Sequence, residues 1–255
     1  MNAYGGAGGG RLRWAANANL RDVPETVAQL KYWSERDENF AGMLIPRACP
    51  DGAMLDHPRL HPVFALSQEL DLPIFVHGGS TRPPATPWTG LGAGNALHHG
   101  IGGMYGVAGL VGGGVFDLFP KLRVGIFESR AGWMPWLIEV LDDGYTPGSR
   151  NTPLTKCKAS EVVARGQLFC AVESDETLLD LCVQNLGEDI WLFSTDYPHN
   201  GTPWPNGVSN IARQPLPEIA KVKMLGTNAL RFLPQLAQYC RTHYPMREAV
   251  KGLLR

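Results

Sequence analysis

Short, almost continuously apolar segments alternate with amphipathic ones along the whole chain, and this alternation restricts the possible folds more than any other feature. Strands that are buried on both faces have this uniform hydrophobicity, whereas strands with one wet face alternate. The apolar segments cover residues 12–19, 41–46, 72–77, 122–128, 168–173 and 190–196. Apolar residues at helical spacing predict helices over residues 23–36, 57–70, 134–141, 177–186 and 219–233. Strand–helix repetition of this kind predicts a parallel sheet with right-handed crossovers.

Two features favour a barrel over an open doubly wound sheet. No glycine fingerprint follows an early strand, and polar residues end four of the predicted strands: His77, Glu128, Glu173 and Asp196. Barrel active sites are built at such carboxyl ends, and 255 residues is close to the ~250 of a TIM barrel. A closed barrel has eight strands, but only six are recognisable. The sequence therefore predicts an α/β fold of the (β/α)8 TIM-barrel type that is incomplete, with the first two strands lacking.

The two ends and one internal region depart from the regular pattern. Residues 1–10 are too few and too rich in glycine to hold a strand and a helix, and residues 234–255 read as a C-terminal tail or helix. Residues 90–114 contain eleven glycines, which indicates a glycine-rich active-site loop with a loosely specified helix running into residues 115–119. Because no linker divides the chain, we expect one domain over residues 1–255.

Charge and cysteine usage exclude several classes of protein. The net charge is -1 and no basic run is present, which argues against nucleic acid or an anionic membrane as a partner. No stretch approaches the ~20 apolar residues of a membrane span, and the N-terminus does not resemble a signal peptide. The five cysteines include no C-x-x-C pair, so we expect free thiols and a cytoplasmic location.

Asp196 and His77 are the strongest candidates for chemistry. Asp196 directly follows an apolar strand in LFSTDYPHN, where its side chain would point into the barrel mouth. Such a carboxylate could bind a metal and move protons, and its structural alternative is a turn aspartate that stabilises the following loop. His77 ends a strand and precedes two glycines, of which Gly78 would let a ligand approach the backbone closely. A histidine at a strand end is also commonly structural.

Glu128 and Glu173 end two further strands. Two carboxylates at the mouth of a barrel also describe a glycosidase, in which one acts as the acid and the other as the nucleophile or base. Either glutamate could instead form a structural ion pair with Arg130 or Arg165.

Several other side chains are candidates for contacts with a substrate. His199 follows Asp196, Trp88 lies in a proline-rich loop, and His98 and His99 are neighbours, so only one of those two would enter a given site. We therefore name Gly78, Trp88, His99 and His199 as substrate-binding candidates, with exposed loop or helix positions as the alternative for the histidines. Five tryptophans are expected in the core: Trp14, Trp33, Trp133, Trp136 and Trp191.

Four segments resemble the amidohydrolase-related proteins, in the branch that contains aminocarboxymuconate semialdehyde decarboxylase and γ-resorcylate decarboxylase. They read HPRLHPVFALSQELDLPIFVHGG, GVFDLFPKLRVGIFESRAGWMPWLIEVLDD, LGEDIWLFSTDYPH and KMLGTNALRFL, in the family's order. The resemblance implies a distorted (β/α)8 barrel with one divalent metal, zinc first and manganese second. It also implies decarboxylation or hydrolysis of a small aromatic or cyclic acid. By this resemblance, His77 corresponds to a metal ligand, and Asp196 corresponds to a residue that is both ligand and proton carrier.

The chain departs from this family pattern twice. The first-strand histidine-x-histidine or acidic-x-histidine pair has no counterpart, so His77 and Asp196 supply two ligands where a zinc site normally has three. We expect either a fragment that begins at an internal Met1, a neighbouring chain that completes the site, or a protein that is not catalytic as it stands. The second departure is Glu128, which stands where the decarboxylases have a catalytic histidine, so hydrolysis becomes at least as plausible as decarboxylation.

The sequence thus predicts a metal-dependent hydrolase or decarboxylase. His77 and Asp196 bind the metal, while Asp196 and Glu128 exchange protons with a small-molecule substrate. The rivals are a truncated, non-catalytic homologue and a glycosidase that uses Glu128 and Glu173. An unclosed barrel leaves two strand edges unpaired, so we also expect a homo-oligomer or an aggregation-prone chain.

Overall fold

The computed structural model describes residues 12–78, 91–150, 153–199 and 202–243. Six strands form one sheet, and each pairs in parallel with its neighbour in the chain, in the order β1-β2-β3-β4-β5-β6. The strands are β1 (Trp14–Asn17), β2 (Phe40–Pro46), β3 (Ile74–His77), β4 (Val124–Phe127), β5 (Leu168–Glu173) and β6 (Trp191–Ser194). An order without reversal is that of a barrel wall, since a doubly wound sheet changes direction at a switch point. The predicted incomplete barrel is confirmed.

Helices connect the strands, and each of the five predicted helical segments, 23–36, 57–70, 134–141, 177–186 and 219–233, contains a helix. They are α2 (Val23–Arg36), α3 (His61–Glu69), α4 (Leu91–Val107), α5 (Val115–Leu118), α6 (Met134–Gly144), α7 (Ala159–Ala164), α8 (Leu179–Leu186), α9 (Gly207–Arg213), α10 (Glu218–Val222), α11 (Asn228–Phe232) and α12 (Gln235–His243). A 3-10 turn, η1 (Pro58–Leu60), precedes α3, and π-helical turns η3 (Ala108–Gly112) and η4 (Lys223–Thr227) follow α4 and α10. No helix in the described part of the chain is long and apolar enough to cross a bilayer.

Local sequence explains where α2 begins. The side chain of Asp22 accepts a hydrogen bond from the backbone N–H of Glu25, and Pro24 occupies the first turn. A side-chain acceptor at the N-cap and a proline just inside are the usual signals of a helix start. The buried Leu30 then attaches α2 to the core.

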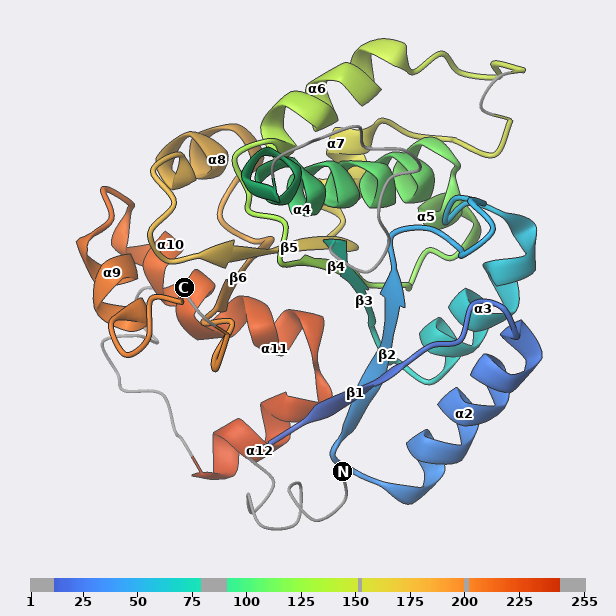
Figure 1. The fold of residues 1–255 in the computed structure, drawn as a ribbon, viewed down its shortest axis with the longest axis horizontal. Helices are drawn as coiled ribbons and strands as arrows, with labels where there is room; N and C mark the ends of the chain where they lie inside the picture. Colours follow the sequence, from blue (N-terminus) through green and yellow to red (C-terminus); the bar gives the residue numbers. More distant parts are fainter. Residues whose placement is uncertain (1–11, 79–90, 151–152, 200–201, 244–255) are drawn as a thin grey trace.

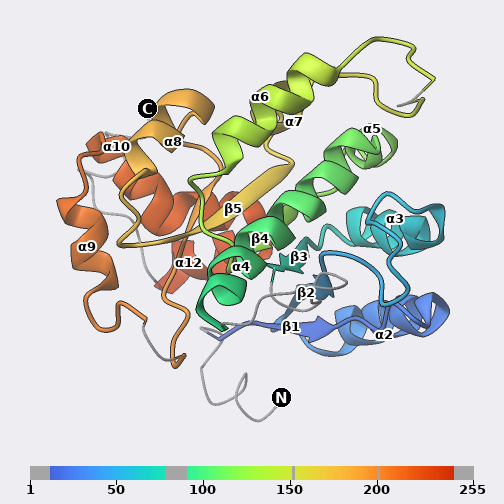
Figure 2. The same cartoon turned by 45° about the horizontal axis from the view of Figure 1, so that its top comes forward.

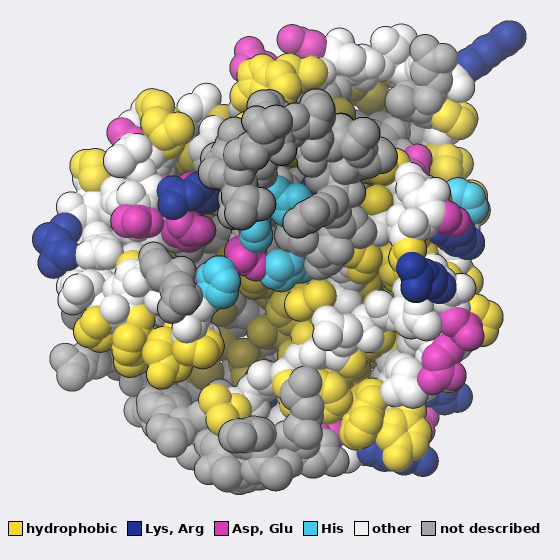
Figure 3. Space-filling model, in the orientation of Figure 1, with side chains coloured by type: hydrophobic (Ala, Val, Ile, Leu, Met, Phe, Trp, Pro, Cys, Tyr) yellow, Lys and Arg dark blue, Asp and Glu magenta, His cyan; other side chains and the backbone are white. Residues whose placement is uncertain are grey.

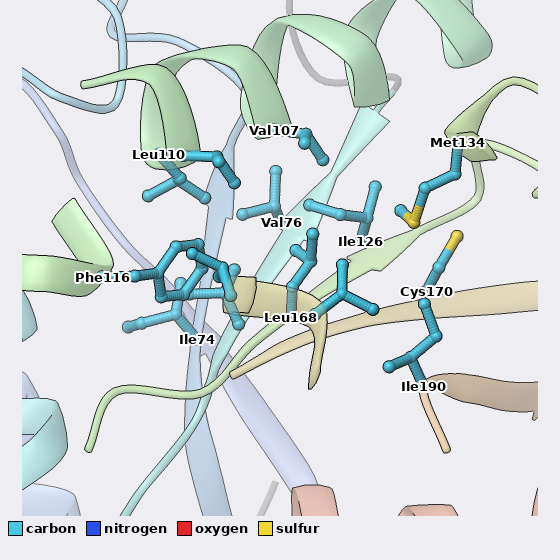
Figure 4. Close-up of a cluster of buried hydrophobic side chains, with 14 of the residues drawn as sticks. Ile74, Val76, Val107, Leu110, Phe116, Ile126, Met134, Leu168, Cys170 and Ile190 are labelled. Carbon is cyan, nitrogen blue, oxygen red and sulfur yellow. The ribbon is translucent and has the colours of Figure 1, made fainter. Parts of the chain in front are cut away.

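The sheet forms a curved wall with different neighbours on its two sides. Helices α4 and α6 lie on one side and α11 lies on the other (Figures 1 and 2). Aliphatic side chains of the strands, such as Val76 and Ile126, meet Val107 and Leu110 on the side of α4 (Figure 4). On the opposite side, Phe232 of α11 packs among aromatic and aliphatic residues of β3 to β6.

The region of residues 90–114 is more regular than predicted. Its described part forms the long helix α4 and the turn η3, whereas we expected a loop followed by a weak helix. A Cβ atom on Gly102 would lie 2.3 Å from the carbonyl oxygen of Gly78, and one on Gly103 would lie 2.7 Å from Cβ of Ser129. The glycines therefore let this helix approach the strand ends closely, and they do not mark a loop.

Two further expectations concern the edges and the tryptophans. Strands β1 and β6 each have one neighbour in the described sheet, so the barrel is not closed there; the predicted oligomer stays a prediction. Trp191 is fully buried as expected, but Trp136 is 57% exposed and was wrongly expected in the core. It lies on an amphipathic helix, α6, whose buried residues are Met134, Leu137 and Ile138.

Candidate functional site

Four neighbouring strands carry the predicted site residues at their carboxyl ends. The register pairs His77 with Phe127 and Glu173 with Ser194. Glu128 and Asp196 therefore lie one and two residues beyond the paired ends of β4 and β6, at the same edge of the sheet. The sequence prediction that these side chains share one end of the wall agrees with this topology.

The backbone at this edge is strained. Among the described residues, Asp71, Glu128, Arg130 and Asp196 are the non-glycine residues with positive φ, with values of 51° to 57°. Three of these four also line one cavity. A left-handed conformation costs a non-glycine residue of order 1–3 kcal/mol, and such strain is concentrated at functional sites. The side chains retained at these positions are therefore candidates for function.

Glu128 is the residue that the two histidines contact. One carboxylate oxygen contacts Nε2 of His77, and the other lies 3.4 Å from Nδ1 of His99, which projects from α4. Nδ1 of His99 also lies 2.9 Å from the carbonyl oxygen of Glu128. Because a carbonyl oxygen only accepts, this nitrogen of His99 carries the proton. Figure 3 shows histidine side chains gathered near an acidic one at the centre of this face.

Asp196 joins the same cluster through a second histidine. Its Oδ2 lies 3.2 Å from Nδ1 of His199. Ligand atoms of Glu128, Asp196 and His199 lie within 4.8 Å of one another, the arrangement that a single cation would need. His77 is not in this group and reaches it through Glu128.

The donor set of this cluster fits a divalent metal ion. Two carboxylates and one imidazole give three protein ligands, the number that catalytic zinc sites commonly keep, and oxygen-rich sets also suit manganese. Glu128 and His199 offer ligand atoms close to Asp196, a set that the sequence alone did not identify. The sequence signal for Glu128 was its place at a strand end, which we interpreted as an acid/base position.

A cavity of about 560 Å³ opens at this cluster. Glu128, Asp196, His99 and His199 line it, as do apolar residues from α4 and the loops, including Leu97, Met104 and Trp133. His99 and His199 thus line the cavity, and their role in substrate binding stays a prediction. Gly78 is buried and absent from the cavity wall, because Ser129 and the backbone of His99 occupy the space beside it. Trp88 lies outside the described residues.

Arg130 and Glu173 form an ion pair in the same wall. Nη2 of Arg130 lies 2.7 Å from Oε2 of Glu173, which confirms one of the structural pairings weighed from the sequence; Arg165 pairs with Asp117 instead. Burial raises the pKa of the Glu173 carboxyl above its ordinary value, although the positive charge of Arg130 opposes this shift.

Sequence reasoning did not find Glu176. Its buried carboxylate accepts hydrogen bonds from the backbone N–H groups of Ala131, at 2.7 Å, and Glu173, at 2.8 Å. Burial raises the pKa of Glu176, and the two N–H donors act in the opposite direction. One carboxylate thus ties the turn after β4 to the turn after β5. The only sequence signal for Glu176 is its position, three residues after the strand-end Glu173.

Comparison with known proteins assigns the chain to a family. The model of the Amidohydrolase family matches residues 2–235. The chain belongs to the amidohydrolase family. This membership agrees with the resemblance found in the four sequence segments and with the barrel-type order of the strands.

One curated relative is the 2-amino-3-carboxymuconate-6-semialdehyde decarboxylase of Dictyostelium discoideum, 28% identical over 192 residues. That match covers 72% of this amidohydrolase chain and 50% of the relative, so the chain spans about half the length of the curated relative it matches.

Solved structures share the fold. The 5-carboxyvanillate decarboxylase of Sphingomonas paucimobilis superposes with a TM-score of 0.77 at 22% identity, over 92% of this chain and 70% of that one. A dihydroxybenzoic acid decarboxylase of Polaromonas sp. JS666, with bound manganese and the inhibitor 2-nitroresorcinol, has a TM-score of 0.74 at 19% identity. That likeness covers 92% of this amidohydrolase chain and 72% of the other.

Proposed function

We propose that this amidohydrolase domain is a metal-dependent enzyme that removes the carboxyl group of a small aromatic acid without oxidation. The observation that carries the proposal is the cluster of Glu128, Asp196 and His199 at the mouth of a cavity with apolar walls. The relatives and fold neighbours described above are decarboxylases of carboxylated aromatic or unsaturated compounds, which supports the substrate class.

In this proposal Asp196, His199 and Glu128 hold one divalent ion, zinc or manganese. The bound ion supplies positive charge that attracts substrate oxygen atoms and stabilises negative charge during the reaction. The partner of a ligating carboxylate orients it and tunes its basicity, and His77 has this position relative to Glu128. Direct ligation by His77, as the sequence suggested, remains a prediction.

The remaining groups handle protons and exclude water. Decarboxylation exchanges the carboxyl group for a proton: the bond between the ring and the carboxyl carbon breaks, carbon dioxide leaves, and a proton adds to the ring carbon. Asp196 lines the cavity and retains its predicted role as the carrier of this proton. The apolar side chains of Leu97, Met104 and Trp133 would pack against the ring and keep water away.

Hydrolysis is the second candidate. A carboxylate at position 128, paired with His77, is suited to accept a proton from an attacking water molecule as well as to bind a metal. The two reactions differ in their products, because decarboxylation of 2,6-dihydroxybenzoate releases carbon dioxide, whereas hydrolysis of an ester or amide releases none.

The test is the metal content and the metal dependence of the purified chain. After chelation and reloading, elemental analysis should find about one manganese or zinc ion per chain, and about none in Asp196→Ala or His199→Ala. His57→Ala is the control, because this histidine is exposed and absent from the cavity wall. His77→Ala should weaken metal affinity by roughly 10- to 100-fold if the histidine acts through Glu128. A wild-type chain that binds neither ion would overturn the proposal and favour the non-catalytic homologue.

A further inference from the structure

The cavity contains one permanent cation amid acidic groups. Among the described residues that line it, Glu128, Glu173, Glu176 and Asp196 are acids, and Arg130 is the lysine or arginine. Among the acidic, basic and metal-bound groups that a carboxylate ligand would meet in this cavity, the side chain of Arg130 and a bound metal ion carry the opposite charge. The position of this guanidinium therefore decides where an anionic group can sit.

The backbone at Arg130 is better suited to glycine than to arginine. Its φ is 57°, and its side chain is 57% exposed, so little burial of the side chain compensates for the strain. Glycine adopts this conformation without the penalty of a Cβ atom. A strained, exposed arginine in a cavity wall is expected where the guanidinium itself has a task.

Glu173, which pairs with Arg130, carries the same chemical group as a carboxylate ligand. The carboxylate of Glu173 lies 2.7 Å from Nη2, at the distance of a charge-assisted hydrogen bond. A guanidinium has five N–H donors in a planar fork that matches a carboxylate, and the same fork would accept the carboxylate of an aromatic acid. Burial raises the pKa of Glu173, and the positive charge of Arg130 opposes this shift.

Glu176 keeps both members of the pair in place. It accepts hydrogen bonds from Ala131, the residue after Arg130, and from the backbone of Glu173 itself. The two turns are therefore held at a fixed separation before a ligand arrives. Such preorganisation reduces the cost of binding.

We propose that Arg130 is the receptor for the carboxylate of the substrate, and that Glu173 is an internal competitor for the same guanidinium. This inference rests on the proposed function for the substrate class, a small aromatic carboxylate. In this inference, the Arg130–Glu173 pair acts in binding and selectivity. If the pair were purely structural, both residues would instead contribute in the same direction to stability.

Two substitutions in one ion pair should have opposite effects. Arg130→Gln should weaken the binding of benzoate by at least about tenfold, because a charge-assisted hydrogen bond is lost. Glu173→Gln should tighten binding by roughly three- to tenfold, because a competitor and a negative charge disappear together. Arg130→Gly should also lose benzoate binding while the domain unfolds at the same or a higher temperature, since glycine tolerates the backbone.

The experiment is calorimetric titration of the chelator-treated chain with benzoate, and with benzamide as the neutral counterpart. Arg36→Gln is the matched control, because Arg36 is 52% exposed, pairs with Glu35 at 3.3 Å and is absent from the cavity wall. The control should bind benzoate like the wild type, and Arg130→Gln should bind benzamide like the wild type. Unchanged benzoate affinity in Arg130→Gln, or weaker affinity in Glu173→Gln, would overturn the inference.

The failure of this inference is distinguishable from failure of the proposed function. In the metal-free chain, the effect of Arg130→Gln on benzoate binding is measured independently of any metal ion, and metal content is measured separately. If benzoate binds only to the metal-loaded chain and does so equally in Arg130→Gln, the metal is the carboxylate receptor and the role of Arg130 is refuted. If Arg130 governs benzoate binding but the chain takes up no metal, the anion site stands and the metal enzyme does not.

Discussion

The interior of the strands and the turns that follow them differ in burial, charge and backbone geometry. Val124 and Ile126 of β4 are fully buried among aliphatic neighbours, whereas Glu128, just after the strand, is half-buried, charged and strained at a φ of 54°. In β5, Cys170 and Val172 are likewise buried, and Glu173 after them faces the cavity. The comparison indicates that the strands stabilise the fold, while the turns keep a strained backbone and charged side chains for function. The following predictions test this division.

The largest effect is expected in the aromatic contact on the side of the sheet that faces α11. Phe232 is buried, and its ring lies 5.1 Å from that of Phe75, 5.9 Å from Phe127 and 5.2 Å from Phe169. Phe232→Ala should lower the free energy of unfolding by about 3–5 kcal/mol, because it leaves a cavity. Urea titration measures the loss. A loss below about 1 kcal/mol would mean that α11 adds little to the stability of the sheet.

The contact between α4 and the strand ends comes next. Gly103→Ala would bring a Cβ atom to 2.7 Å from both Ser129 and Trp133, so it should destabilise the domain by about 1–3 kcal/mol. Gly100→Ala on the same helix is the control, because its Cβ atom would meet nothing closer than 3.9 Å. Helix propensity then favours alanine by about 1 kcal/mol, so this variant should be stabilised. Equal melting temperatures for the two variants would contradict the close packing of this helix.

Glu176 connects the two regions, and its removal should cost about 1–3 kcal/mol. In Glu176→Gln, one backbone N–H group loses its acceptor and faces an amide donor, so a buried donor is left without a partner. Thermal unfolding measures the cost, with Glu139→Gln on the exposed face of α6 as a control of the same chemistry.

Comparison of the wild type with Glu176→Gln also tests the raised pKa of Glu176. Because the folded carboxyl keeps its proton at pH values where the unfolded one has lost it, folding is favoured below the ordinary carboxyl pKa. This contribution is lost as the pH rises through the raised pKa. The stability of the wild type relative to Glu176→Gln should therefore fall across this window as pH increases, and a difference that rises with pH would contradict the assigned direction.

The smallest effect on stability is expected in the turn after β4, and this effect is a stabilisation. Glu128→Gly removes the strain of a positive φ and should stabilise the domain by up to about 1 kcal/mol, while metal binding is lost. Calorimetric unfolding and elemental analysis of the same sample measure both effects. Marked destabilisation would show that the contacts of Glu128 with His77 and His99 stabilise the fold more than its backbone strains it.

The strands could be predicted from sequence because burial on both faces produces continuous apolar runs. The predicted segment 168–173 coincides with β5, and 72–77 begins two residues before β3. Helix α4 could not be predicted, because glycine has low helix propensity and the reason for its use, contact with Gly78 and Ser129, is tertiary. The exposed Trp136 was misplaced because residue type was given more weight than its position on the helix.

The site was predicted in outline only. His77, Glu128 and Asp196 could be placed at one edge of the sheet because carboxyl ends of parallel strands meet, a rule that requires no side-chain geometry. The link from Glu176 to Ala131 joins residues 45 positions apart, and the pairing of His77 with Glu128 is equally non-local, so neither leaves a local sequence pattern. The contacts of Glu176 and of Glu128 therefore needed the fold.

The most direct measurement of the central claim is an anomalous-difference map from crystals of the chain soaked with Zn²⁺. The account predicts one strong peak within ligand distance, roughly 2.0–2.2 Å, of Asp196, His199 and Glu128. A well-ordered map without a peak between these three side chains, or with the ion bound elsewhere, would contradict it.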